Sequence, residues 1–366
     1  MVQVYYVPAE DTDFCSILMH QHKATPLLHV HMKLARSFAS SGISKRALLA
    51  ATAVLLLISG IGVGIFSSMR QHTSHTIAVI PRTCGTWLWE AEHTGATRAA
   101  ASYGQNIYWN APMREDDVQG QIDILAQAVS RHMAGIILSP VEELPLRTPV
   151  RNALSHGLPV VVVDTDLGLP VSKQLSYVLN DEHLGGQLAA RRVGMLLGGH
   201  GSVAVLGISH LLTTSSERAR SFETTLSSEF PRIHVIARSQ ARDTVSEEQQ
   251  NAEKLLTANH DLGAIIALSE FSTRGAYYAL TEFERTHQTH LIGFDQNLLA
   301  PIRTRDIDSV VIQNTDRMGR EAVRIVAEHA STTQYGKRMI IAPMLVTPQN
   351  IDSPEVLATL DLGWYQ

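Results

Sequence analysis

From residue 76 onward, short and continuous apolar runs alternate with longer segments whose apolar residues recur at helical spacing. The first unit begins with the run Ile77–Ile80, passes through a loop at 81–86 and enters a helical stretch that Gly104 ends. Apolar runs without polar alternation are typical of strands that are buried on both faces. The repetition therefore predicts a parallel sheet that is covered by helices on both sides.

The number of apolar runs indicates more than one sheet. A doubly wound unit holds about five or six strands, and this chain has nine candidate strands, so two lobes are favoured. We therefore expect an α/β fold with two doubly wound parallel-sheet lobes in a domain at 76–350. The expected boundaries are about 76–176 and 314–345 for the first lobe, and about 177–313 and 346–366 for the second. The candidate strands are 77–80, 106–109, 135–138, 159–163, 203–206, 234–237, 264–268, 290–294 and 309–312.

The segment Ala47–Phe66 is uncharged, mostly apolar and long enough, at about 1.5 Å per residue, to cross a bilayer as a helix. Lys45 and Arg46 precede it, so the positive-inside rule places its amino end in the cytoplasm and residues 67–366 outside. We expect an N-terminal transmembrane helix that acts as a signal anchor, followed by a tether at 67–75. A cleaved signal peptide is the alternative, which would leave the domain free in the periplasm. A buried core helix is disfavoured because the run has no polar face.

Residues 1–46 are expected to be a cytoplasmic tail or a misassigned start, together with the basic region before the apolar run. Met32 begins a complete basic n-region, which leaves open whether residues 1–31 are translated. These 46 residues hold five basic and three acidic side chains, so the remaining chain carries a formal charge of −7. An acidic body gives no reason to expect nucleic acid as a partner. Cys15 and Cys84 lie on opposite sides of the proposed span and show no metal-ligand spacing, so we expect no disulfide, metal site or cofactor.

Polar and aromatic side chains follow the candidate strands where each strand ends. Open parallel sheets bind ligands at this edge, and two facing edges would enclose a cleft. The candidate ligand-binding residues are Thr86, Trp89, Asp164, Thr165, Arg218, Ser269, Asp295 and Gln313.

The chemistry of these groups suits a sugar or another polyol. An indole ring can pack on the C–H face of a sugar, while carboxylate, guanidinium and amide groups bind its hydroxyls. Trp87 and Trp89 stand two residues apart and cannot both face the cleft, and we expect Trp89 to do so. Three alternatives stay open, namely a helix cap for Asp164, a surface ion pair for Arg218 and a turn for Asp295.

Several stretches between Thr76 and about Gln349 resemble periplasmic sugar-binding proteins of the ribose-binding type, which feed ABC transporters. GTWLWEAEHTGA is similar to the family's Asn-Pro-Phe-Phe/Trp loop and first helix, and GLPVVVVDTD is similar to the strand that ends in a ligand Asp. SSERARSF resembles Arg-x-x-x-Phe, LIGFDQ the Gly-Phe-Asp strand end, and VVIQNTDRMG the Gln-x-x-x-x-Met-Gly segment. The resemblance implies a type I periplasmic binding protein fold. It also implies Trp89 as the stacking aromatic and hydroxyl-binding roles for Asp164, Arg218, Asp295 and Gln313.

The sequence departs from that family at four site positions, one of which is Leu88 where the family has an aromatic residue. Thr86 stands where the family has Asn, Thr165 where it has Arg, and Ser269 where it has Asn. Such a pocket would make fewer direct bonds to a pentose, so a different, larger or modified sugar is expected rather than ribose.

We therefore expect a solute-binding protein that closes on a sugar or polyol and delivers it to an ABC transporter permease. The alternative is a membrane-anchored extracytoplasmic sensor that passes lobe closure to a membrane receptor or another signalling partner. An enzyme is not expected, because the chain has no G-x-S-x-G and no phosphate-loop motif. A carboxylate pair of Asp164 and Asp295 for glycoside hydrolysis is the enzymatic alternative.

Overall fold

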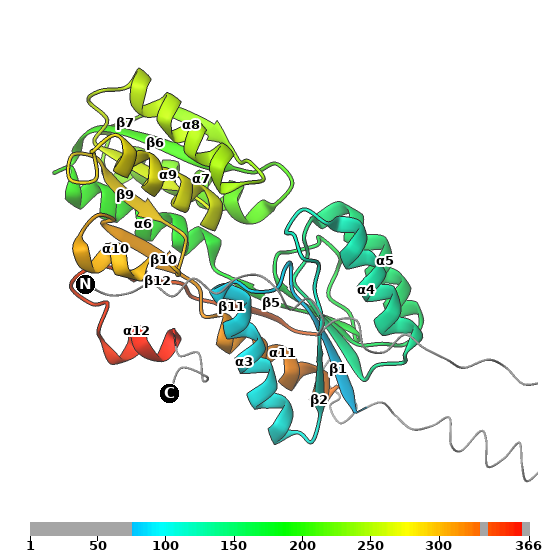
Figure 1. The fold of residues 1–366 in the computed structure, drawn as a ribbon. Helices are drawn as coiled ribbons and strands as arrows, with labels where there is room; N and C mark the ends of the chain where they lie inside the picture. The colour runs from blue at the N-terminus through cyan, green and yellow to red at the C-terminus, as the bar shows by residue number, and fades with distance from the viewer. Residues whose placement is uncertain (1–74, 330–335, 361–366) are drawn as a thin grey trace, which may run out of the picture. The chain divides into compact units, whose positions relative to one another are not determined.

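The computed structural model describes residues 75–329 and 336–360, which form two six-stranded sheets with helices on both faces (Figure 1). The chain divides into the units Met1–His72 and Thr73–Gln366, and only the second is described here. The expectations for residues 1–46, 47–66 and most of 67–75 lie outside the described residues. Within 75–329 and 336–360, no helix combines the length and apolar character that a bilayer crossing requires.

The first sheet is entirely parallel and has the order β11-β5-β4-β3-β1-β2. Its central strands β1, β3 and β4 are buried along their length except at the start of β1, as their continuous apolar sequences predict. Its strands are β1 (Thr76–Ile80), β2 (Asn106–Trp109), β3 (Gly135–Leu138), β4 (Val160–Asp164), β5 (Leu175–Asn180) and β11 (Arg338–Ile341).

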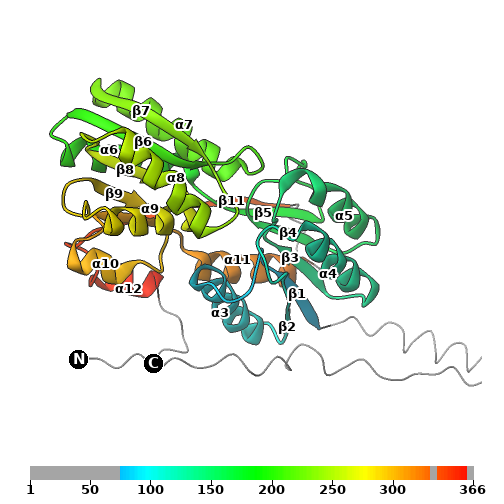
Figure 2. The ribbon, with the colours of Figure 1, turned by 45° about the horizontal axis from the view of Figure 1, so that its top comes forward.

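Four helices cover this sheet, and together they form the first lobe. Helices α4 (Val118–Ser130) and α5 (Glu143–Ser155) pack on one face, whereas α3 (Trp87–Ser102) and α11 (Thr315–Glu328) pack on the other (Figure 2). Helix α11 follows the last parallel strand of the second sheet, yet it packs against α3 of the first. The first lobe is therefore completed by chain that follows β10, the last parallel strand of the second sheet.

The second sheet has the order β12-β10-β9-β8-β6-β7, and only β12 runs antiparallel to its neighbour. Helices α6 and α7 pack on one face, whereas α8 and α9 pack on the other. The strands are β6 (His200–Ile208), β7 (Arg232–Gln240), β8 (Ala264–Ala267), β9 (His290–Gly293), β10 (Ser309–Ile312) and β12 (Met344–Val346). The helices of this second lobe are α6 (Glu182–Leu196), α7 (Thr213–Glu229), α8 (Val245–Ala258), α9 (Glu270–Glu282), α10 (Leu299–Thr304) and α12 (Pro354–Thr359).

The chain crosses between the lobes three times, after β5, after β10 and after β11. All nine candidate strands are present, but the first crossing differs from the expected position at residue 177. Strand β5 runs to Asn180 within the first sheet, and its Ser176 and Asn180 interrupt the apolar pattern by which the other strands were recognised. The antiparallel edge strand β12 also makes the second sheet mixed rather than purely parallel.

Helices α3 and α11 approach each other closely through two glycines. A Cβ atom on Gly95 would overlap the backbone carbonyl of Asp316, and one on Gly319 would overlap that of Glu92. We expect Gly95→Val to lower the free energy of unfolding by about 1–3 kcal/mol or more, because neither backbone can move away without separating the helices. Urea unfolding monitored by circular dichroism would measure this. Ala101→Val, at an exposed position of the same helix, is the control, and an equal cost for both variants would contradict the prediction.

Candidate functional site

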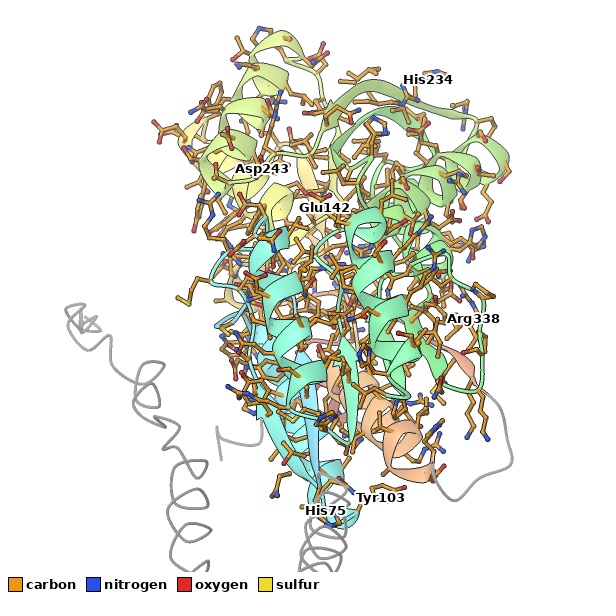
Figure 3. The ribbon with its side chains drawn as sticks, turned by 90° about the vertical axis from the view of Figure 1, so that its right-hand side faces the viewer. His75, Tyr103, Glu142, His234, Asp243 and Arg338 are labelled. Carbon is orange, nitrogen blue, oxygen red and sulfur yellow. The ribbon has the colours of Figure 1, made fainter. Side chains whose placement is uncertain are left out.

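A cavity of about 180 Å³ lies where the two lobes face each other, and loops from both lobes line it. These loops follow the carboxyl ends of β1, β2, β3 and β4 in the first lobe and of β6, β7, β8, β9 and β10 in the second. Figure 3 shows Glu142 and Asp243 where the lobes meet, and Tyr103 and His234 toward opposite ends of the domain. The predicted cleft between two strand-end edges is therefore present.

Trp89 is one of three large aromatic side chains that line the cavity, together with Phe271 and Phe294. Its side chain is fully buried at the start of α3, and its Nε1 donates to Oε1 of Glu115 at 3.5 Å. Trp87 is 38% exposed and does not line the cavity. The two tryptophans thus point apart, and Trp89 is the one directed to the cleft, as expected from their spacing.

Asp164 ends β4 in a backbone conformation that is unusual for its residue type. Its φ of 66° lies in the left-handed region, which costs a non-glycine residue on the order of 1 kcal/mol and is concentrated at functional sites. The side chain is 4% exposed and pairs with Nη2 of Arg82 at 2.5 Å. A loop and then β5 follow Asp164 rather than a helix, so the helix-cap alternative is not realised.

Arg218 enters the cavity from α7 of the second lobe. Its Nε and Nη2 donate to the carboxylate of Glu182, with Nη2 at 2.9 Å from Oε1, and its Nη1 donates to the carbonyl of Leu268 at 2.7 Å. Both partners of this pair are buried, and burial raises the pKa of Glu182 against the opposing effect of Arg218. The surface-pair alternative is wrong, because the nearby Glu217 binds Arg220 instead.

Gln313 lies on the crossing from β10 to α11 and connects the polar groups of the two lobes. In the amide orientation that matches donors with acceptors, its nitrogen donates to Oδ1 of Asp164 at 3.0 Å. Its oxygen then accepts from Nη2 of Arg218 at 2.5 Å. A continuous polar line therefore runs Arg82–Asp164–Gln313–Arg218–Glu182 across the floor of the cavity, and each charged group in it has an opposite partner.

The cavity includes Ser269 but not Thr86, Thr165 or Asp295. The hydroxyl of Thr86 is buried at the start of α3, and Thr165 is fully buried beside Arg82. Asp295 turns its carboxylate toward Arg274 at 3.0 Å and accepts from the backbone N–H of Asn297 at 2.9 Å, which realises the turn alternative. Direct ligand contact by these three residues remains a prediction that the cavity lining does not support.

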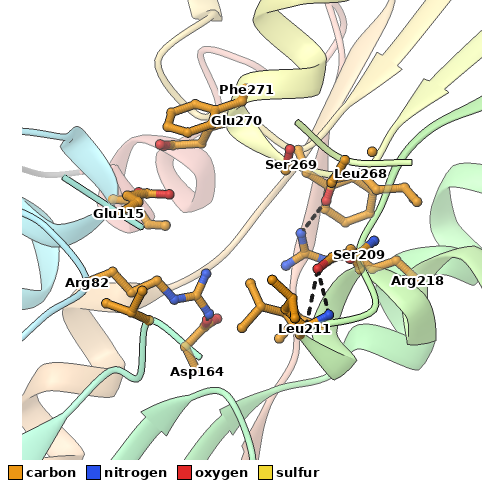
Figure 4. A pocket seen from close by; sticks show the side chains of 18 of the residues that line it. Arg82, Glu115, Asp164, Ser209, Leu211, Arg218, Leu268, Ser269, Glu270 and Phe271 are labelled. Carbon is orange, nitrogen blue, oxygen red and sulfur yellow. Dashed lines mark hydrogen bonds and ion pairs between the residues drawn. The ribbon is translucent and has the colours of Figure 1, made fainter. Parts of the chain in front are cut away.

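Several cavity residues were not anticipated from the sequence. Arg82 is one of them, although it follows a buried strand and thus carries the same signal that identified Asp164. Acidic side chains from both lobes also line the cavity, and Figure 4 shows Glu115 and Glu270 on facing sides of it. Burial raises the pKa of Glu270 well above its ordinary value, and Asp295 and Glu115 add to the rise. The remaining acidic groups of the lining are Asp116, Glu142 and Asp243.

Two α/β lobes that are joined by three crossings around a polar and aromatic cleft define a two-lobed solute-binding protein. A family model described as periplasmic binding protein domain matches residues 77–334, and the chain belongs to this family.

Characterised relatives of this chain are named as sugar-import binding proteins. The chain is 25% identical over 219 residues to a D-apiose import binding protein of Actinobacillus succinogenes, which covers 60% of this chain and 69% of the relative. It is 24% identical over 240 residues to the ribose import binding protein of Bacillus subtilis, covering 64% and 75%.

Solved structures share the fold. A carbohydrate-transporter solute-binding protein from Agrobacterium radiobacter, in complex with D-arabinose, matches with a TM-score of 0.72 at 23% identity, over 80% of this chain and all of that one. A solute-binding protein from Agrobacterium vitis with bound D-fucose matches with a TM-score of 0.71 at 24% identity, over 77% and 98%.

Proposed function

We propose that this protein binds a monosaccharide or similar polyol in the cavity between its lobes and delivers it to an ABC transporter permease. The observation that carries the proposal is the buried ring of Trp89 beside the polar line Arg82–Asp164–Gln313–Arg218–Glu182. Aromatic surface suits the C–H face of a sugar, and the polar line offers both donors and acceptors to its hydroxyls. The names of the relatives support the same ligand class.

The charges of the cavity favour an uncharged ligand. Arg82 and Arg218 are each paired with a carboxylate, so neither guanidinium requires an anion from the ligand. The acidic groups around them, among them Glu115, Asp116 and Asp243, would repel a sugar phosphate or a sugar acid. A neutral polyol needs only hydrogen bonds, which this lining can supply.

Transport follows from closure of the lobes on the ligand. The three crossings form a hinge at which the lobes can rotate toward each other, and the closed pair would present one continuous surface to a permease. A binding role rather than catalysis agrees with the family. The sensor alternative rests on an uncleaved anchor at 47–66, which lies outside the described residues, and it stays a prediction together with the periplasmic or membrane-anchored location.

A thermal-shift screen of the full chain, followed by calorimetric titration, tests the proposal. The panel is D-arabinose, D-ribose, D-fucose, D-tagatose, D-galactose and myo-inositol. At a hundredfold excess over the dissociation constant, a true ligand stabilises the folded state by about 2.7 kcal/mol and raises the melting temperature. We expect at least one panel member to do so.

Two tryptophan variants locate the binding site in the same screen. Trp89→Ala should weaken binding by at least about tenfold, because the ligand loses its apolar contact surface. Trp87→Ala, which removes the same side chain outside the cavity, is the matched control and should retain binding. A well-folded protein that binds no panel member, or equal losses in the two variants, would contradict the proposed function.

A further inference from the structure

Away from the crossings, a hydrogen bond joins the two lobes at the edge of the cavity. Oε1 of Glu143, the first residue of α5 in the first lobe, accepts at 2.5 Å from the backbone N–H of Thr213, the first residue of α7 in the second. The preceding residues, Glu142 and Leu212, line the cavity, whereas Glu143 and Thr213 do not. Figure 3 places Glu142 where the lobes meet. The contact therefore lies next to the ligand space without being part of it.

Helix α7 receives from the other lobe what its own first turn lacks. The first N–H groups of an α-helix have no acceptor within the helix, and the helix dipole makes this end positive. Leu212 stands at the N-cap of α7 and makes no side-chain hydrogen bond, and the first turn holds no acidic residue. The carboxylate of Glu143 therefore supplies both an acceptor and a negative charge to α7.

The first lobe holds the start of α5 in a fixed place. Gln121 of α4, which is fully buried, binds the loop that leads into α5. Its amide donates to the carbonyl of Ser139 at 2.9 Å and to that of Pro81 at 3.1 Å. It also accepts from the backbone N–H of Val141 at 2.8 Å. The position of Glu143 is thereby tied to its own lobe, so less conformational freedom is lost when it binds α7.

We infer that Glu143 and Thr213 form a latch, which is the hydrogen bond between Oε1 of Glu143 and the N–H of Thr213, and that it holds the lobes closed on the ligand. The lobes rotate about the crossings when they open, so a bond between α5 and α7 breaks as they separate. A latch that exists only in the closed form raises ligand affinity, because it increases the fraction of closed protein. The inference rests on the proposed function and deepens it, because it identifies residues that set the affinity without touching the ligand.

Calorimetric titration of Glu143→Ala with the panel sugar that binds tests the latch. We expect the dissociation constant to rise about three- to tenfold, because a carboxylate that binds a helix N-terminus is lost. The change should lie mainly in the dissociation rate constant, which stopped-flow fluorescence measures, because the latch must break before the ligand leaves. Asp123→Ala is the matched control and should bind as wild type does, since Asp123 is an exposed carboxylate on α4 of the same lobe that does not line the cavity.

Thr213→Pro removes the donor of the same bond and keeps the helix. Proline is favoured at the first position of a helix, because the N–H that it lacks has no acceptor within the helix. Leu212 already has the extended backbone that a following proline requires, with φ of −125° and ψ of 128°. Thr213→Pro should therefore weaken binding by about the same factor as Glu143→Ala. The double variant should bind no more weakly than either single variant.

Three results would contradict the latch and leave the proposed function intact. The first is wild-type affinity in Glu143→Ala. The second is a double variant in which the losses of the two single variants multiply, because the two residues would then act separately. The third is a lower urea midpoint of ligand-free Glu143→Ala with an unchanged dissociation rate constant of the ligand, which would mean that Glu143 only stabilises the fold. Failure of wild type to bind any panel sugar would instead overturn the proposed function and the inference together.

Discussion

Glu182→Ala is expected to lower the free energy of unfolding by about 3–5 kcal/mol, because Arg218 would keep a buried charge without its counterion. The side chains of Arg218 and Glu182 are only 7% and 8% exposed, so water cannot replace the lost carboxylate. The carbonyl of Leu268 and the amide of Gln313 would remain as partners, and neither carries charge. Equilibrium unfolding in urea at neutral pH measures the effect.

Glu229→Ala provides a matched control for this experiment. It removes the carboxylate of another Arg–Glu pair, in which Arg191 and Glu229 are 47% and 39% exposed. Such exposed pairs contribute little to stability, because water and salt screen the two charges. A double variant, Glu182→Ala with Arg218→Met, should recover part of the stability that Glu182→Ala loses. Similar costs for Glu182→Ala and Glu229→Ala would show that the buried pair is not a principal support of the lobe.

Glu92→Gln is expected to remove a pH dependence of stability. Glu92 is fully buried in α3, accepts from the hydroxyl of Ser139 at 3.2 Å, and burial raises its pKa to about 8. Between pH 4.5 and about 8 the folded state therefore holds a proton that the unfolded state has released. Stability then falls as pH rises, by about 1.4 kcal/mol per pH unit and by several kcal/mol across the window.

Glutamine is uncharged at every pH, so Glu92→Gln should be more stable than wild type at pH 8 and nearly equal to it at pH 4.5. The comparison of urea midpoints across this range gives the result directly. Glu90→Gln, on the same helix but partly exposed, should follow the wild-type pH profile. Parallel profiles for wild type and Glu92→Gln would mean that Glu92 is not protonated in the folded protein.

Continuous apolar sequence was sufficient to predict the central strands of both sheets. The three strands that were not predicted lack that signal. Strand β5 contains Ser176 and Asn180, β11 lies at a sheet edge with exposed positions, and β12 has three residues.

Parallel sheets bind ligands beyond the carboxyl ends of their strands, and the prediction of the site used this general property. Five of the predicted residues line one cavity, because the topology brings these positions together: Trp89, Asp164, Arg218, Ser269 and Gln313. The topology determines where a residue lies along the sheet edge, but it does not determine the direction in which the side chain points. Asp295 follows its strand as Asp164 does, yet its carboxylate faces Arg274.

The partner of Arg218 illustrates a second limit of the sequence. Glu182 stands 36 positions earlier in the chain, at the start of α6, and no local pattern connects the two residues. Arg82 and Glu92 also interact with residues that are distant in the sequence, namely Asp164 and Ser139, so no local pattern identifies them.

Because the chain crosses between the lobes three times, the first lobe cannot be completed until late in synthesis. Strands β6 to β10 of the second lobe are contiguous in the chain and leave the ribosome before α11 and β11 are made. By then the first lobe has strands β1 to β5 and helices α3, α4 and α5. The part of its sheet that α11 covers is still exposed, and the edge strand β11 is missing until residue 341 has emerged. A nascent chain that stops before α11 would therefore expose apolar surface of this sheet, which would make truncated products substrates for chaperones and proteases.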